Sequence, residues 1–172
     1  MNARHHKSIT ELDSGNTQPP ERDEFTDFLT LASMGQLRLD QLLYQCDVLH
    51  SAGRIKDVIH LYQQWIQNTD APNKELALFN YGSALQNIGQ TNLAEAAYRE
   101  CVQLNPKLVQ ASINLGLVLE RQGLDDQAIE EWTTVVAKGL LHTSEDKSME
   151  VMALNHIGRV YEKLKKYDLA EQ

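Results

Sequence analysis

Apolar residues recur at helical spacing along nearly the whole chain. The first such stretch follows residue 20, where acidic residues precede apolar ones: Glu21, Asp23, Glu24, then Phe25, Phe28, Leu29, Leu31 and Ala32. Acids in a first turn, followed by apolar residues three and four apart, are typical of a helix start. We therefore predict a leading helix over residues 21–36 that stops near Gly35. From there to Gln172 the helical spacing continues without sustained alternation, so no strands are predicted.

Residues 1–20 differ from the rest because they hold almost no large apolar side chains and end in two prolines. Such a segment buries too little surface to offset the entropy lost on ordering. We predict a disordered or extended tail. The adjacent His5 and His6 are interpreted as solvated tail residues, because a metal site needs three or four converging ligands.

Glycines and their neighbours repeat at an interval of 34 residues. Gly82 recurs as Gly116, and Gly89 recurs as Gly123. Three further pairs keep the same interval: Ala94 and Ala128, Tyr98 and Trp132, Cys101 and Val135. The first glycine lies inside a predicted helix, where it costs about 1 kcal/mol relative to alanine. That cost is tolerable where a neighbouring helix must approach closely. The second glycine is expected to end the helix, where a left-handed residue is favoured.

This pattern resembles the tetratricopeptide repeat family. The residues that carry the resemblance are Leu78, Tyr81, Gly82, Leu85, Gly89, Ala94, Tyr98, Cys101 and Pro106 in one unit, and Leu115, Gly116, Leu119, Gly123, Ala128, Trp132 and Val135 in the next. The sequence departs from the family at Ser112. It also departs at Leu140, which stands where proline is usual. The resemblance implies an all-α fold, a right-handed superhelical solenoid of antiparallel helix pairs. We expect about three and a half repeats after the leading helix.

Within this fold the solenoid is predicted over residues 37–172. Its repeats are expected near 39–72, 75–108, 109–142 and 151–172, the last one incomplete.

Weaker units flank the two clear ones. Upstream, Cys46 replaces the glycine inside the helix, while Gly53, Tyr62 and Trp65 keep the family spacing. Downstream, Gly158 lies 42 residues after Gly116, so eight extra residues precede it. We expect the insertion to lengthen the next helix by about two turns at 3.6 residues each.

The insertion and the last unit carry further expectations. Gly139 is expected to end a helix, and His142 to lie in the inserted loop. The second helix of the last unit is expected to start near Tyr167. Because the sequence stops at Gln172, the apolar face of the helix over 146–164 would lack its cover. We therefore expect self-association through this open C-terminal end.

In this family the first helix of each pair lines a concave groove, which binds an extended peptide or a partner helix. The resemblance therefore implies candidate groove residues: Phe79, Asn80, Ser83, Asn87, Gln110, Ile113, Asn114, Leu117, Arg121, Asn155 and Arg159. For Phe79, Ile113 and Leu117, packing against neighbouring helices is an equal alternative. The family members that grip chaperone carboxylates use a positive clamp. Here Leu43 and Asp47 stand at the clamp positions of the first unit. Neither is basic, and the positive clamp is therefore absent.

Two asparagines stand out among the groove candidates. Asn80 and Asn114 each lie two residues before the glycine inside the helix, where an amide can bridge to the backbone of an extended peptide. The phrase NLGLVLERQGLDDQAIEEW is similar to the repeat arm of O-linked N-acetylglucosamine transferases and their bacterial SPINDLY-like relatives. That likeness implies a second hypothesis, a substrate-presenting arm of a larger glycosyltransferase whose catalytic part is absent from this sequence.

Charge and composition exclude several classes of partner. Lys plus Arg number 16 and Asp plus Glu number 24, which gives a net charge of −8. This balance argues against nucleic acid and against an anionic membrane as partners, and suits neutral or basic proteins. No apolar run approaches the roughly 20 residues that span a membrane. The first residues lack a secretory signal, and the two cysteines Cys46 and Cys101 fit a reducing compartment, so we expect a cytoplasmic location.

The sequence also lacks the common catalytic motifs GxGxxG, GxxxxGK[ST], HExxH and CxxC. Cys101 occupies a position where the family prefers alanine, so we interpret it as a small core residue. We therefore expect a protein-binding module with no activity, cofactor or metal of its own.

Overall fold

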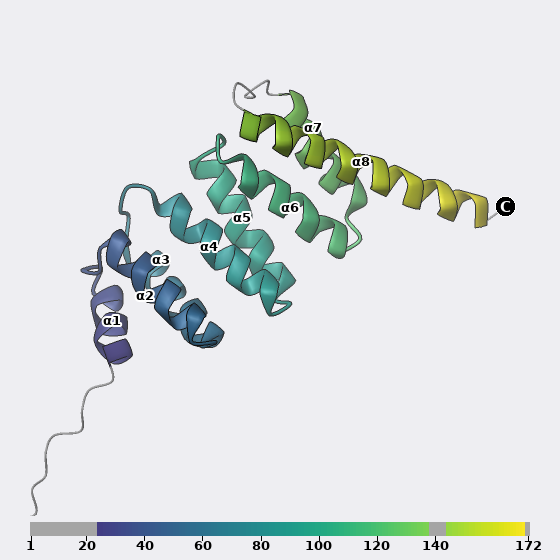
Figure 1. Cartoon of the computed structure of the whole chain (residues 1–172). Coiled ribbons are helices and arrows are strands. Elements are labelled where there is room, and N and C mark those ends of the chain that lie inside the picture. The colour runs from purple at the N-terminus through teal and green to yellow at the C-terminus, as the bar shows by residue number, and fades with distance from the viewer. Residues whose placement is uncertain (1–23, 138–143, 171–172) are drawn as a thin grey trace, which may run out of the picture.

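The computed structural model describes residues 24–137 and 144–170, and every regular element in them is a helix (Figure 1). The helices are α1 (Glu24–Ser33), α2 (Leu39–Ser51), α3 (Ile55–Asn68), α4 (Lys74–Asn87), α5 (Thr91–Leu104), α6 (Val109–Arg121), α7 (Asp125–Ala137) and α8 (Ser144–Ala170). The all-α prediction is confirmed for these residues. The predicted tail, residues 21–23, Gly139 and His142 lie outside them.

Consecutive helices form antiparallel pairs that stack side by side into a solenoid (Figure 1). The pairs are α2 with α3, α4 with α5, and α6 with α7. Each pair packs against the next through α3 and α4 or through α5 and α6. At one end α1 packs against α3, and at the other α8 packs against α7 and α6. The predicted solenoid of helix pairs is therefore confirmed.

The turn inside each pair depends on a left-handed glycine. Gly53, Gly89 and Gly123 follow α2, α4 and α6 with φ of +73°, +75° and +77°. A side chain added at any of these glycines would meet open space, so the backbone conformation alone requires glycine there. The prediction that the second glycine of each unit ends a helix is confirmed.

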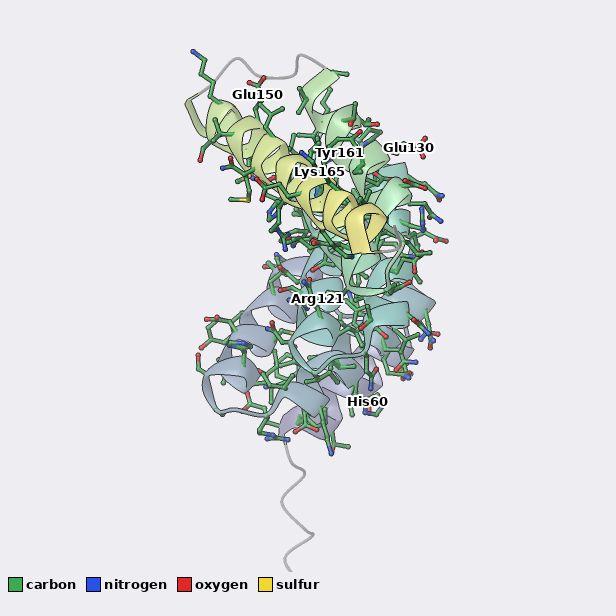
Figure 2. All side chains as sticks on the ribbon, turned by 90° about the vertical axis from the view of Figure 1, so that its right-hand side faces the viewer. His60, Arg121, Glu130, Glu150, Tyr161 and Lys165 are labelled. Carbon is green, nitrogen blue, oxygen red and sulfur yellow. The ribbon has the colours of Figure 1, made fainter. Side chains whose placement is uncertain are left out.

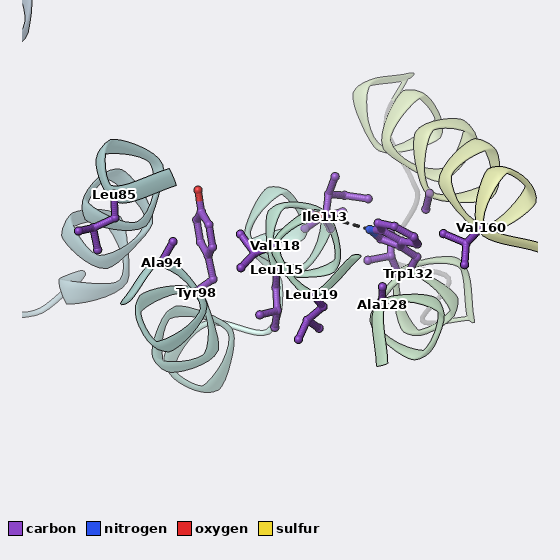
Figure 3. Close-up of a cluster of buried hydrophobic side chains, with 13 residues drawn as sticks. Leu85, Ala94, Tyr98, Ile113, Leu115, Val118, Leu119, Ala128, Trp132 and Val160 are labelled. Carbon is purple, nitrogen blue, oxygen red and sulfur yellow. Dashed lines mark hydrogen bonds between the residues drawn. The ribbon is translucent and has the colours of Figure 1, made fainter. Parts of the chain in front are cut away.

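The glycines inside helices have a different cause, which is close packing against a ring. A Cβ on Gly82 would lie 2.8 Å from Cε1 of Tyr98, and a Cβ on Gly116 would overlap the indole of Trp132. Both rings are fully buried, and Trp132 donates from Nε1 to the Ile113 carbonyl at 3.1 Å (Figure 3). The expected close approach is therefore made by an aromatic side chain from the second helix of the same pair.

Helix α8 corrects one prediction and confirms another. It runs unbroken for 27 residues, so the second helix expected near Tyr167 does not form. The reason is local: Lys165 stands seven residues after Gly158, where Gly89 and Gly123 end the corresponding helices. At its other end α8 begins at Ser144, about two turns earlier relative to its glycine than α4 and α6 do, as the insertion predicted.

Two ion pairs fasten α8 across the preceding pair. Arg159 contacts Glu120 of α6 at 2.6 Å, and Lys163 contacts Asp125 of α7 at 2.8 Å. Val160, on the same side of α8, is fully buried beside Trp132 (Figure 3). The remaining face of α8 is turned away from the solenoid, and several of its apolar side chains are exposed.

Candidate peptide-binding groove

The first helices of the pairs, α2, α4 and α6, form one face of the molecule, which we call the groove face. On this face the structure contains a cavity of about 350 Å³ between α2 and α4. Its floor comes from α3. The lining residues are Leu43, Cys46, Asp47, His50, Val58, Tyr62, Asn80, Ser83, Ala84 and Asn87. The predicted residues Asn80, Ser83 and Asn87 are thus brought together in one cavity.

Sequence reasoning missed the half of this cavity that α2 and α3 supply. Asp47 and His50 are exposed on α2, and Tyr62 of α3 is 4% exposed beneath them. The signal was available, because Asp47 follows Cys46 as Ser83 follows Gly82 in the next unit. The degenerate first unit therefore contributes more lining residues to the cavity than the clear second one.

Each of the two predicted asparagines is bonded to a tyrosine of the preceding helix pair. A side-chain hydrogen bond joins Asn80 to Tyr62. Asn114 donates to the Tyr98 hydroxyl at 3.3 Å, and Tyr98 donates in turn to Oε1 of Gln86 at 3.0 Å. Burial raises the pKa of Tyr98 to about 12 and raises the pKa of Tyr62 further still, so both phenols stay neutral. The tyrosines hold the asparagine side chains in place, and each amide keeps further donor and acceptor groups for a ligand.

The two thiols belong to the core. Burial raises the pKa of Cys46 to about 12, and that of Cys101 to about 12, so neither forms a thiolate near neutral pH. Cys46 is hydrogen-bonded to the side chain of Tyr62, and Cys101 contacts the carbonyl oxygen of Glu75 at 3.2 Å. The interpretation of Cys101 as a small packing residue is confirmed.

Between α4 and α6 the groove face is filled by larger side chains. Leu117 is half-buried, Arg121 is exposed, and Phe79 packs against the Tyr98 ring at 6.1 Å between centroids. Ile113 is only 2% exposed, so its side chain lies in the core and the packing alternative holds for it. Gln110 is half-buried near the start of α6. None of these candidates is among the lining residues of the cavity between α2 and α4.

Between α6 and α8, one of the predicted residues, Arg159, is held by contacts within the chain. Arg159 pairs with Glu120 and lies 3.0 Å from Nδ1 of His156. The His156 ring stacks on Trp132 with 5.0 Å between centroids. Burial, and then the charge of Arg159, lower the pKa of His156, so its imidazole is neutral at pH 7. Asn155 is exposed on α8.

The described residues hold no group of three or more His, Cys, Asp or Glu that could bind a metal ion. In the same part of the chain, every helix is too short or too polar to cross a membrane.

Stacked antiparallel helix pairs, two of which have a ring packed on a glycine, define a helical-repeat solenoid. Residues 76–108, which span most of the α4–α5 pair, match the tetratricopeptide repeat family. The chain therefore contains a tetratricopeptide repeat and has the fold of tetratricopeptide repeat proteins.

Solved structures agree on the fold. The TPR domain of Sgt2 from Aspergillus fumigatus is similar, with a TM-score of 0.61 and 19% identity over 77% of this chain and 83% of that one. MamA is similar with a TM-score of 0.55 and 21% identity over 84% of this chain and 88% of that one. No curated protein sequence is significantly similar to the chain.

Proposed function

We propose that this chain is a protein–protein interaction module that binds an extended peptide or a partner helix on its groove face. The observation that carries the proposal is the cavity between α2 and α4, which is open to solvent and lined by the side chains of Asn80, Ser83 and Asn87. Pockets of several hundred Å³ with a few converging polar groups are typical binding sites. The proposal includes no chemistry of the chain's own and a cytoplasmic location, which suits two free, buried thiols.

The test is a peptide array probed with two double variants. We expect Asn80→Ala with Asn114→Ala to weaken binding about tenfold or more, because the amides that would bridge to a peptide backbone are lost. Circular dichroism is expected to show unchanged helicity.

The matched control for this experiment is Tyr62→Phe with Tyr98→Phe. It removes the same asparagine–tyrosine hydrogen bonds but leaves both amides on the groove face. Binding that survives in the tyrosine variant and falls in the asparagine variant supports a direct role. An equal loss in both variants would contradict a direct role of the two amides, because Tyr62 lines the same cavity, and no loss in either variant would place the peptide elsewhere.

The glycosyltransferase-arm hypothesis stays a prediction. Both asparagines that suggested it are bonded to tyrosines, and the equivalent α8 position is His156, stacked on Trp132. The row of asparagines therefore has two members in the described residues. The hypothesis requires a catalytic domain encoded beyond Gln172, which the full gene sequence would reveal.

We also propose that the outer face of α8 mediates self-association. Tyr161 is 57% exposed, whereas Leu85 at the equivalent position of α4 is fully buried by its partner helix. A Cβ added at Gly158 would meet nothing within 4 Å, whereas one at Gly82 or Gly116 would meet a ring. Figure 2 shows Tyr161 on α8 at this end of the molecule. Two antiparallel α8 helices related by a two-fold axis would place each Tyr161 opposite the other's Gly158.

Sedimentation velocity across a concentration series tests this contact. We expect the wild-type chain to associate as its concentration rises, and Tyr161→Ser to shift the association to about tenfold higher concentration. The control is Tyr44→Ser, which changes an even more exposed tyrosine on α2, at 70% against 57%. A strict monomer at the highest soluble concentration, or equal effects of both substitutions, would contradict the proposal.

A further inference from the structure

The lining of the cavity between α2 and α4 includes a carboxylate but no lysine or arginine. Asp47 is the one carboxylate among its lining residues, and none of them is a lysine or arginine. The other titratable group at the rim is His50, and the rest are neutral: Leu43, Cys46, Val58, Tyr62, Asn80, Ser83, Ala84 and Asn87. Within residues 24–137 and 144–170, no ion pair uses Asp47. Its charge is therefore available to a ligand.

The groove face has two intervals between first helices, one between α2 and α4 and the next between α4 and α6. The second interval lacks this arrangement. Asp47, Ser83 and Leu117 each follow the residue packed beneath the ring of their pair, so the three positions are equivalent. Four residues further on, Asn87 of the first interval is replaced by Arg121 of the second. The second interval therefore presents a leucine and a cation where the first presents a serine and an amide. The first interval therefore favours a positively charged ligand group, and the second interval favours a negatively charged one.

The polar groups around Asp47 complement a cation. The amide oxygens of Asn80 and Asn87 and the hydroxyl of Ser83 can each accept a hydrogen bond from a positively charged donor. A carboxylate with neighbouring neutral acceptors suits a guanidinium, which has five donors in a fixed fork, or an ammonium, which has three. The net charge of −8 favours the approach of basic partners over longer range.

We propose that this cavity is a specificity pocket for a basic side chain, arginine or lysine, of the bound protein, and that Asp47 is its counter-charge. The inference rests on the proposed function, since it names the chemistry of the partner for the same groove face. The pocket fixes one position of the ligand, while Asn80 and Asn114 hold its backbone.

Nuclear magnetic resonance with a single-residue probe tests the pocket separately from the rest of the groove. The probe is N-acetyl-arginine amide, and its neutral isostere N-acetyl-citrulline amide is the ligand control. We expect saturable shifts of the backbone amides of α2 and α4 around the cavity with the arginine probe. Binding of the citrulline probe is expected to be at least about tenfold weaker, because the charge-assisted contact is lost.

Two variants complete the experiment. Asp47→Asn keeps the shape of the side chain and is expected to reduce arginine binding to the level of citrulline. Asp126→Asn, which removes another exposed carboxylate from α7, is expected to change nothing. Arginine binding that is insensitive to Asp47→Asn, equal binding of citrulline, or no shift of pocket amides up to the solubility limit of the probe would each overturn the inference.

The peptide array separates this outcome from the wider proposal. Peptides bound by the wild type are expected to be enriched in arginine or lysine at one position, and Asp47→Asn is expected to lose that enrichment. Binding without the enrichment would overturn the basic pocket and leave the interaction module standing. An array that binds nothing, combined with a positive arginine titration, would overturn the peptide groove and leave the pocket.

Discussion

Gly116→Ala is expected to destabilise the chain by about 2 kcal/mol, although alanine is the better helix former. In an exposed helix the substitution would gain about 1 kcal/mol. Here the new methyl would lie 2.8 Å from Cδ1 of Trp132 and closer still to the pyrrole nitrogen. The indole cannot retreat, because it is fully buried and bonded to the Ile113 carbonyl. Overpacking a site of this kind costs about 3 kcal/mol, which outweighs the helical gain.

Gly158→Ala is the matched control for this substitution. It lies at the same repeat position on α8, but a methyl there meets nothing within 4 Å. We expect the control to stabilise the chain by up to about 1 kcal/mol. Urea denaturation followed by circular dichroism, at a concentration low enough to keep the chain monomeric, measures both free energies of unfolding. Equal effects of the two substitutions would show that helix propensity, rather than the ring, decides this position.

The glycines explain why so much of the fold was predictable. Glycine serves two purposes in this fold: it tolerates a positive φ, and it leaves room for a ring. The two uses recur seven residues apart. A helix-ending role was predicted for Gly89 and Gly123, and a close approach by a neighbouring helix was predicted for Gly82 and Gly116, where the structure places a ring. The absence of the second glycine, with Lys165 in its place, is also what lets α8 continue.

The candidate site was less predictable, because side-chain contacts between pairs decide it. Repeat position alone placed Ile113 in the groove, but its side chain is in the core. Position also treated Asn80 and Asn114 as equals, whereas Asn80 lines the cavity between α2 and α4 and Asn114 is not among its lining residues. The charge of Asp47 was visible in the sequence, but its place at this cavity depends on how α2 packs beside α4.

Trp65 shows how the N-terminal end of the solenoid is closed. It stands where the other pairs have Cys101 and Val135, and it is fully buried. Its Nε1 donates to the carbonyl of Leu37 at 2.7 Å, in the turn between α1 and α2. In the same core cluster, the Phe25 ring meets His60 at 6.5 Å between centroids, and Ala32 of α1 is fully buried. The indole therefore connects α1 and its turn to α3, and α1 covers the end of the stack.

Trp65→Ala is expected to cost about 3–5 kcal/mol, the usual loss for a large aromatic removed from a core. The cavity would lie beneath the turn that holds α1, and the Leu37 carbonyl would lose its donor. Because each pair in a solenoid depends mainly on its neighbours, we expect the damage to concentrate in α1, α2 and α3. Amide hydrogen exchange measures this directly: protection should fall in these helices well before it falls in α6 and α7.

Trp65→Phe separates the hydrogen bond from the packing. It keeps most of the buried ring and leaves the Leu37 carbonyl without its donor, so we expect a smaller cost of about 1–3 kcal/mol. Exchange in α1 should rise in this variant too, because the bond spans the turn that carries α1. If Trp65→Ala lowers protection evenly along the whole solenoid, the chain unfolds as one cooperative unit. The N-terminal closure would then be no weaker than the rest, contrary to this expectation.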